Sequence, residues 1–214
     1  MTISDEIIVV GVGGHGRVLL DALLAFGARV YGLLDPGLAA GTEVMGVTVL
    51  GGDEVLARLA STRYRLANGL GANPFTVERA SLCKRLSQNG YRFASVVHPS
   101  AVVGRDTELG EGSQIMARAV VQCGGRIGRN VVVNTAASLD HDVLIEDDAF
   151  IAPGAVLCGA VELGRGAFIG AGAVVLPGVR IGANAVIAAG ALVCSEVPAG
   201  GVFSGVPARR HKKV

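Results

Sequence analysis

An unbroken six-residue period constrains this sequence more than any other feature. From Val97 to Val193 every sixth residue is Val, Leu or Ile, which makes seventeen consecutive matches. The fourth residue after each match is small or β-branched, as at Ala149 and Ala185. A hexapeptide period is typical of a parallel β-helix, in which each hexad supplies a short strand and a turn and three hexads close one coil. Residues 97–198 are therefore expected to form just under six coils.

A glycine-rich turn precedes the repeat. The sequence before residue 36 reads as a strand, a turn with Gly11, Gly13 and Gly16, a helix, and a second strand that ends at Asp35. This spacing fits G-x-G-x-x-G, and Asp35 stands 19 residues after the last glycine, where a dinucleotide-binding unit places its ribose-binding acid. Such glycines let backbone N–H groups approach a phosphate at the helix N-terminus. The same pattern also fits a tight strand-to-helix turn without a ligand.

The rest of the first hundred residues continues the strand and helix alternation. The patterns predict strands over 47–50, 64–69 and 92–97 and helices over 53–60 and 73–89. Together with the glycine turn they predict a Rossmann-like α/β unit. Because this unit is too short for a two-halved dinucleotide fold, a mononucleotide or a nucleotide-sugar is a better ligand than NAD.

Composition excludes several classes of function. The net charge is +1 and the basic residues are scattered, so no basic stripe for nucleic acid is expected. The one basic run, over 209–213, is a solvated end or a contact for a ligand phosphate. The four cysteines form no C-x-x-C pair, which argues against a zinc knuckle or redox motif and favours a reduced, cytoplasmic protein. An acidic start and the lack of a long apolar run predict neither export nor membrane insertion.

His141 is the candidate for acid–base chemistry. It occupies a non-core position of its hexad, between Asp140 and Asp142. An imidazole has a pKa suited to removing a proton near neutral pH, and a neighbouring carboxylate fixes its tautomer. The residues one 18-residue coil away are Cys123 and Gly159, and Gly159 leaves room beside the ring and offers a backbone N–H. A lone surface histidine without a catalytic role is the alternative.

The hexapeptide repeat, the Gly-x-Gly-Gly-His-Gly turn, the segment Asn134–Asp142 and the terminal Gly205-Val-Pro-Ala-Arg209 together resemble the hexapeptide-repeat acyltransferases. Within them the chain is similar to the sialic-acid O-acetyltransferase-like branch, the N-acetyltransferases of nucleotide-linked 4-amino sugars used in bacterial surface glycans such as O-antigen. The resemblance spans essentially the whole chain. It implies a left-handed β-helix, a homotrimer, acetyl-CoA bound between neighbouring helices and no metal.

The resemblance also implies roles for individual residues. His141 would be the general base, Asp142 its orienting acid and Asn134 a neighbour of the acceptor or acetyl group. The nucleotide-sugar would be held by Gly13, Gly14, His15, Gly16, Asp35 and Pro36, and the CoA channel would be lined by Gly159, Ala171, Ala189, Pro207 and Arg209. Many relatives carry a second histidine where this chain has Phe150.

The expected organisation is an α/β nucleotide-sugar-binding domain over 1–96, a left-handed β-helix over 97–198 and a tail over 199–214. The expected reaction is direct attack of the 4-amino group of a 4-amino-4,6-dideoxy sugar on acetyl-CoA, without an acyl-enzyme on Cys123. A sugar O-acetyltransferase and a non-catalytic β-helix scaffold stay open, and the residues do not separate GDP from UDP. A zinc site of converging imidazoles is disfavoured because His98 and His141 are not a whole number of coils apart.

Overall fold

The computed structural model describes residues 6–211. The chain divides after Pro99 into two compact units, unit 1 up to Pro99 and unit 2 from Ser100. The sequence pattern predicts one boundary after residue 96 and a second after residue 198. Residues 1–5, which carry most of the acidic start, and Lys212 and Lys213 of the basic run lie outside the described residues. None of the helices within residues 6–211 combines the length and apolar character that a bilayer-spanning helix requires.

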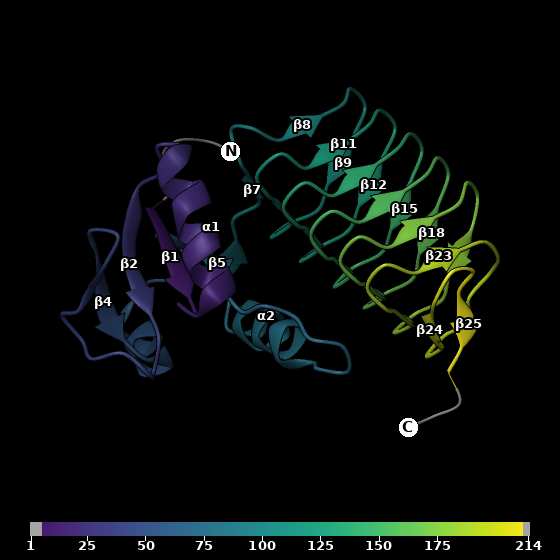
Figure 1. Cartoon of the computed structure of the whole chain (residues 1–214). Coiled ribbons are helices and arrows are strands. Elements are labelled where there is room, and N and C mark those ends of the chain that lie inside the picture. Colours follow the sequence, from purple (N-terminus) through teal and green to yellow (C-terminus); the bar gives the residue numbers. More distant parts are fainter. Residues whose placement is uncertain (1–5, 212–214) are drawn as a thin grey trace. The chain divides into compact units, whose positions relative to one another are not determined.

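Unit 1 is an α/β unit built on one mostly parallel sheet (Figure 1). Its elements are β1 (Glu6–Val10), α1 (Gly14–Ala25), β2 (Val30–Leu34), β3 (Glu43–Val44), β4 (Val47–Gly51), η1 (Asp53–Arg58), β5 (Tyr64–Asn68), α2 (Glu78–Gln88), β6 (Arg92–Phe93) and β7 (Val96–Val97). The strand order is β3-β4-β2-β1-β5-β6, with only β3 antiparallel to its neighbour. The helix predicted over 53–60 is a single 3₁₀ segment, η1, and the strand predicted over 92–97 is broken into two.

The central strands of unit 1 are apolar because the sheet is covered on both faces. Ile7, Ile8 and Val9 of β1 are fully buried, as are Leu33 and Leu34 of β2. Parallel sheets of this kind read as continuous hydrophobic runs rather than alternating patterns. Since β1, β2 and β5 run parallel, the turns that follow them lie at one edge of the sheet.

Unit 2 is the predicted parallel β-helix, and Figure 1 shows its coils stacked in chain order from teal to yellow. Three sheets form its sides. Sheet 1 contains β8 (Val102–Val103), β11 (Val120–Val121), β14 (Ser138–Leu139), β17 (Val156–Leu157), β20 (Val174–Val175) and β23 (Leu192–Val193). Sheet 2 contains β9 (Glu108–Leu109), β12 (Arg126–Ile127), β15 (Leu144–Ile145), β18 (Glu162–Leu163) and β21 (Arg180–Ile181). Sheet 3 contains β10 (Gln114–Ile115), β13 (Val132–Val133), β16 (Phe150–Ile151), β19 (Phe168–Ile169), β22 (Val186–Ile187), β24 (Val202–Ser204) and β25 (Arg209–Arg210).

Every strand from β8 to β23 ends on an aliphatic residue of the predicted series, and most of these side chains are buried in the core. Neighbouring strands pair parallel with an offset of 18 residues, as Leu139 does with Leu157. The turns between strands are called corner 1 after sheet 1, corner 2 after sheet 2 and corner 3 after sheet 3. The expected tail contributes β24, parallel to β22, and β25, antiparallel to β24.

The outward side chains of sheets 1 and 2 differ in character. Sheet 1 presents an apolar stripe, here named the sheet 1 stripe, which consists of Val102, Val120, Ser138, Val156, Val174 and Leu192. Val102 is 57% exposed and Val156 is 37% exposed. Sheet 2 instead presents charged residues around Leu144, with ion pairs Arg126–Glu108 at 4.0 Å and Arg180–Glu162 at 3.0 Å.

The two residues of β15 allow the inward stack to be tested. Ile145 is 3% exposed and Leu144 is 42% exposed. We expect Ile145→Ala to lower the free energy of unfolding by about 2–5 kcal/mol, because it leaves a cavity in the coil interior. Leu144→Ala is expected to change it by about 0.5 kcal/mol or less. Guanidinium unfolding of both variants measures the difference, and equal losses would contradict the assignment of the two faces.

Candidate active site

His141 and Asp142 form a hydrogen-bonded pair at corner 1, directly after β14. The Nδ1 atom of His141 lies 2.9 Å from Oδ2 of Asp142. The backbone N–H of His141 donates to Oδ1 of Asp140 at 2.8 Å, and Asp142 has a left-handed backbone with φ of 58°. The side chains of His141 and Asp142 are 56% and 70% exposed. The pair is therefore open to a substrate that approaches from solvent.

The electrostatics of this corner suit a general base. The hydrogen bond to Asp142 raises the pKa of His141, the charge of Asp140 raises it further, and partial desolvation opposes both. In the neutral tautomer that donates from Nδ1 to Asp142, the lone pair resides on Nε2. The carboxylate thus fixes which nitrogen of His141 can accept a proton.

Gly159 lies one coil beyond His141 and faces its ring. A Cβ built on Gly159 would lie 2.6 Å from Nε2 and 2.7 Å from Cε1 of His141, so the imidazole occupies the space of the missing side chain. No described residue accepts a hydrogen bond from the Gly159 N–H. Cys123, one coil before, accepts the Asp142 N–H through its carbonyl at 3.1 Å and is exposed.

Three of the predicted site residues lie on a different corner. Asn134, Ala171 and Ala189 all follow sheet 3 at corner 3, whereas His141 and Gly159 follow sheet 1. The amide oxygen of Asn134 accepts the Thr135 N–H at 2.8 Å. Within one chain the structure therefore does not bring these residues to the His141 ring, although Asn134 is only seven positions away in sequence.

Phe150, the position at which the family resemblance implies a second histidine in many relatives, is an outward residue of sheet 3. Its ring stacks on that of Phe168, one coil later, with centroids 5.5 Å apart and an interplanar angle of 3°. Phe150 is 7% exposed. A stacked aromatic pair therefore includes the position at which the family resemblance implies a second histidine in many relatives.

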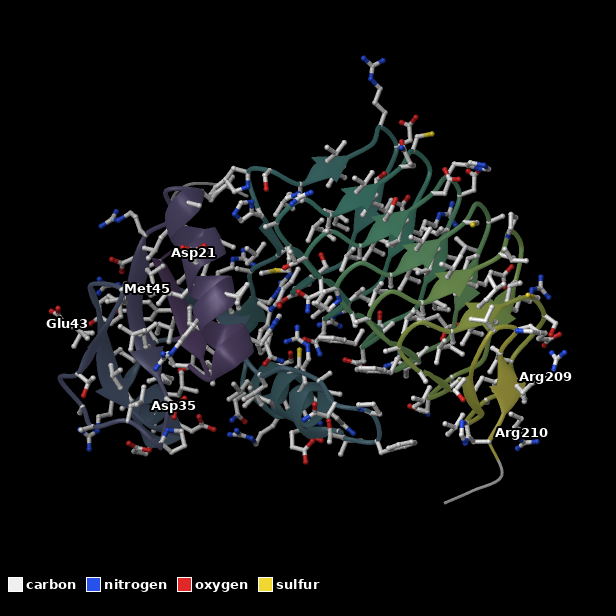
Figure 2. The ribbon with its side chains drawn as sticks, in the orientation of Figure 1. Asp21, Asp35, Glu43, Met45, Arg209 and Arg210 are labelled. Atoms are coloured by element: carbon white, nitrogen blue, oxygen red, sulfur yellow. The ribbon has the colours of Figure 1, made fainter. Side chains whose placement is uncertain are left out.

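Pro207 and Arg209 belong to the hairpin that ends the β-helix. The N–H of Ala208 donates to the Leu192 carbonyl at 2.7 Å, which ties the hairpin to the last strand of sheet 1. Figure 2 shows Arg209 and Arg210 on β25, and both are exposed. The guanidinium groups are accessible to an anionic ligand.

The glycine turn of unit 1 contains two kinds of glycine. A Cβ on Gly16 or on Gly69 would lie 2.0 Å from the Gly11 carbonyl oxygen, so these two positions exclude any side chain. Gly13 and Gly14 instead face open space within 4 Å. Gly13 caps α1 without a side-chain hydrogen bond, which leaves first-turn N–H groups available to a phosphate.

Asp35 lies directly after β2 and holds the glycine turn in place (Figure 2). Its Oδ2 accepts the Val12 N–H at 2.7 Å, and its Oδ1 accepts the Gly37 N–H at 2.9 Å. A carboxylate has about four acceptor sites, so a ribose hydroxyl could still donate to Asp35. Pro36 separates Asp35 from Gly37, and His15 is half-buried in the first turn of α1.

Sequence reasoning missed Asn68 and Arg79, which shape the neighbouring loop. Nη1 of Arg79, a residue only 5% exposed, donates to the carbonyls of Asn68 at 2.9 Å and Leu70 at 2.7 Å. Asn68 in turn donates to the Arg79 carbonyl at 3.0 Å. A Cβ on Gly71 would lie 3.4 Å from Cβ of His15, so this loop borders the predicted nucleotide site. The Asn68-Gly69 pair at the end of β5 was the sequence feature that could have indicated this loop.

Within residues 6–211 no group of three or more His, Cys, Asp or Glu side chains is placed to hold a metal ion. None of the described cysteines, Cys83, Cys123, Cys158 and Cys194, forms a disulfide.

Comparisons with known proteins agree with both units. Residues 6–85 match the family model "PglD N-terminal domain", and residues 160–195 match "Bacterial transferase hexapeptide (six repeats)". The acetyltransferase domain of PglB from Neisseria gonorrhoeae in complex with acetyl coenzyme A is 32% identical, with 97% of this chain and all of that chain covered and a TM-score of 0.90. A histidine-to-asparagine mutant of perosamine N-acetyltransferase from Caulobacter crescentus, in complex with CoA and GDP-perosamine, is 33% identical, with 97% of each chain covered and a TM-score of 0.89. WeeI from Acinetobacter baumannii is 27% identical, with 96% of this chain and 99% of that chain covered and a TM-score of 0.86.

The predicted α/β unit followed by a left-handed β-helix is confirmed.

The contact between Asp142 and His141 predicts that the pKa of His141 depends on residue 142. Asp142→Asn replaces the carboxylate whose hydrogen bond raises the pKa of His141 most, so we expect that pKa to fall toward the value of free imidazole. The four histidine signals of the chain can be followed by NMR against pH, and His141→Asn identifies the relevant one. An unchanged pKa in Asp142→Asn would contradict the pairing.

Proposed function

The chain belongs to the hexapeptide-repeat acetyltransferases that carry a PglD-type N-terminal domain, and on that premise we propose that it moves the acetyl group of acetyl-CoA to the 4-amino group of GDP-perosamine. The chain is a sugar acetyltransferase, and the finer assignment rests on one observation. The Nε2 atom of His141 lies over Gly159 at an exposed corner, in a chain that matches a perosamine N-acetyltransferase over nearly its whole length. The class of acceptor is thus a nucleotide-linked 4-amino-4,6-dideoxy sugar.

His141 is the general base of the proposed reaction. The amine attacks the thioester carbonyl carbon, and Nε2 of His141 takes a proton from the nitrogen as the new C–N bond forms. The C–S bond then breaks, and the imidazolium returns the proton to the departing CoA sulfur, which yields an amide and free CoA. A positioned base of this kind contributes about 10²–10⁴ in rate.

Gly159 is proposed to polarise the thioester. Its N–H lies at the corner that the His141 ring faces, and it donates to no described residue. A backbone donor directed at the developing oxyanion stabilises the tetrahedral intermediate without any reorganisation. No covalent acyl-enzyme is needed, and Cys123 takes no part.

Unit 1 is proposed to bind the nucleotide. Gly13, Gly14 and His15 present the open start of α1 to the diphosphate, and Gly16 permits the close turn. Asp35 and Pro36 follow β2, where the ribose or base would lie. The preference for GDP over UDP rests on the relative from Caulobacter crescentus alone.

A homotrimer would complete the CoA channel. Gly159 lies at corner 1, whereas Asn134, Ala171 and Ala189 lie at corner 3. A channel lined by Gly159, Ala171 and Ala189, with Asn134 beside the acceptor or acetyl group, takes corner 1 from one copy and corner 3 from another. Pro207 and Arg209 of the hairpin are proposed to contact the phosphates of CoA. We assign the reaction to the cytoplasm, in the synthesis of a bacterial surface glycan, in keeping with described cysteines that form no disulfide.

Release of CoA from acetyl-CoA tests the reaction directly. We expect turnover with GDP-perosamine and a loss of about 10²-fold or more in His141→Ala, because the general base is removed. A UDP-linked 4-amino sugar and the matching 4-hydroxy sugar are the comparison acceptors. Turnover with the hydroxy sugar only would make the protein an O-acetyltransferase, and silence with all three would favour a scaffold.

The sheet 1 stripe predicts how copies associate. Val156→Lys places a charge in the middle of this apolar surface, so we expect the mass in solution to fall from three chains to one. Leu144→Lys on the charged sheet 2 is the matched control and should leave the trimer intact. Light scattering after gel filtration measures both masses. A trimeric Val156→Lys variant would show that another surface joins the copies.

A further inference from the structure

Gly124 lies one coil before Asp142 and directly under its side chain. A Cβ built on Gly124 would lie 2.6 Å from Oδ1 of Asp142, well inside van der Waals contact. The other carboxylate oxygen, Oδ2, is the one that contacts Nδ1 of His141 at 2.9 Å. The carboxylate therefore lies between the imidazole and the space where Gly124 lacks a side chain.

The backbone alone does not require glycine at this position. Gly124 has a φ of 74°, but the equivalent residues at corner 1 include Asp106 and Ala160, both with φ of 58°. The coil thus tolerates side chains in this left-handed conformation. What a side chain at position 124 meets is the Asp142 carboxylate, and Ala160 meets no equivalent carboxylate because Gly178 follows it one coil later.

We propose that Gly124 is a positioning residue for the transfer reaction, because the absence of its side chain lets the Asp142 carboxylate reach Nδ1 of His141. The inference rests on the proposed function, in which His141 is the base. Gly124 itself contacts neither substrate nor His141. It acts through Asp142 alone.

A methyl group added at position 124 would meet the end of the Asp142 side chain, which is 70% exposed. The backbone of Asp142 is held by its N–H, which donates to the Cys123 carbonyl at 3.1 Å. A displaced carboxylate therefore rotates about its own side-chain torsions, and we expect this rotation to lengthen the contact between Oδ2 and Nδ1 of His141. The ionisable groups that face His141 are Asp140 and Asp142, with Cys123 stacked one coil before. Loss of the Asp142 contact leaves Asp140 as the remaining charge.

Gly166 provides a matched control at corner 2. It has a φ of 66°, and a Cβ there would lie 2.6 Å from Oδ1 of Asn184, one coil later. Asn184, like Asp142, is left-handed, with φ of 54°. Gly166→Ala thus introduces the same backbone strain and the same contact with a side-chain oxygen, but at a corner without His141. Any effect common to Gly124→Ala and Gly166→Ala is structural.

The experiment compares Gly124→Ala, Gly166→Ala and the wild-type chain in rate and in histidine titration. We expect both variants to lower Tm by a similar few degrees, because both place alanine at positive φ against an oxygen. Only Gly124→Ala should lower kcat, by about tenfold or more, with little change in KM for acetyl-CoA. It should also lower the pKa of His141, so that the acid limb of the rate profile moves to lower pH.

A double variant separates positioning from general damage. In an Asp142→Ala background the carboxylate is gone, so adding Gly124→Ala should change kcat less than about twofold. A further tenfold loss there, or equal losses of kcat in Gly124→Ala and Gly166→Ala, would overturn the inference. If the wild-type chain releases no CoA, the proposed function fails, but the His141 titration still decides the role of Gly124: an unchanged pKa in Gly124→Ala would reject it.

Discussion

The 18-residue register of the coils is the constraint on which the rest of unit 2 depends. Each strand pairs with the strand one coil away through hydrogen bonds of constant offset, and the buried aliphatic residue of every strand stacks on the next. A slip by one residue would turn these side chains outward and bury the outer ones, so the register is strongly fixed. The residues at the corners follow the same 18-residue register. His141 must therefore lie between Cys123 and Gly159, and Asp142 between Gly124 and Ala160.

Corners 1 and 2 use charged residues in different ways. At corner 2 the carboxylates are matched by cations: Arg165 lies 2.9 Å from Asp147 and 3.4 Å from Asp148, and Arg129 lies 3.7 Å from Glu111. Such exposed pairs contribute about 0–1 kcal/mol each. At corner 1 none of the described Lys or Arg residues forms an ion pair with Asp140 or Asp142. The hydrogen bond between His141 and Asp142 raises the pKa of His141 most, and the charge of Asp140 raises it further.

The repeat made the β-helix predictable because a six-residue period leaves few alternatives, and the glycine spacing similarly indicated the turn of unit 1. The separation of Asn134 and His141 in space was harder to predict from the sequence. Seven residues along a coil cross from corner 3 to corner 1, and closeness in sequence there means separation in space. Gly124 was not singled out because glycine is common at every corner, and only the direction of the Asp142 side chain distinguishes it. The roles of the site residues stay predictions until they are measured.

Missing side chains shape both candidate sites, the turn before α1 in unit 1 and corner 1 in unit 2. In unit 1, the Gly11 carbonyl occupies the space that a Cβ on Gly16 or Gly69 would need, while Gly13 and Gly14 at the start of α1 are exposed. In unit 2, Gly124 and Gly159 make room on either side of a carboxylate and an imidazole. The Asp142 carboxylate lies against Gly124 and the His141 ring against Gly159, and both side chains stay exposed to solvent. A chain with small side chains at its corners can therefore still orient His141 and Asp142, because the coil backbone, rather than packed side chains around them, defines where the two residues lie.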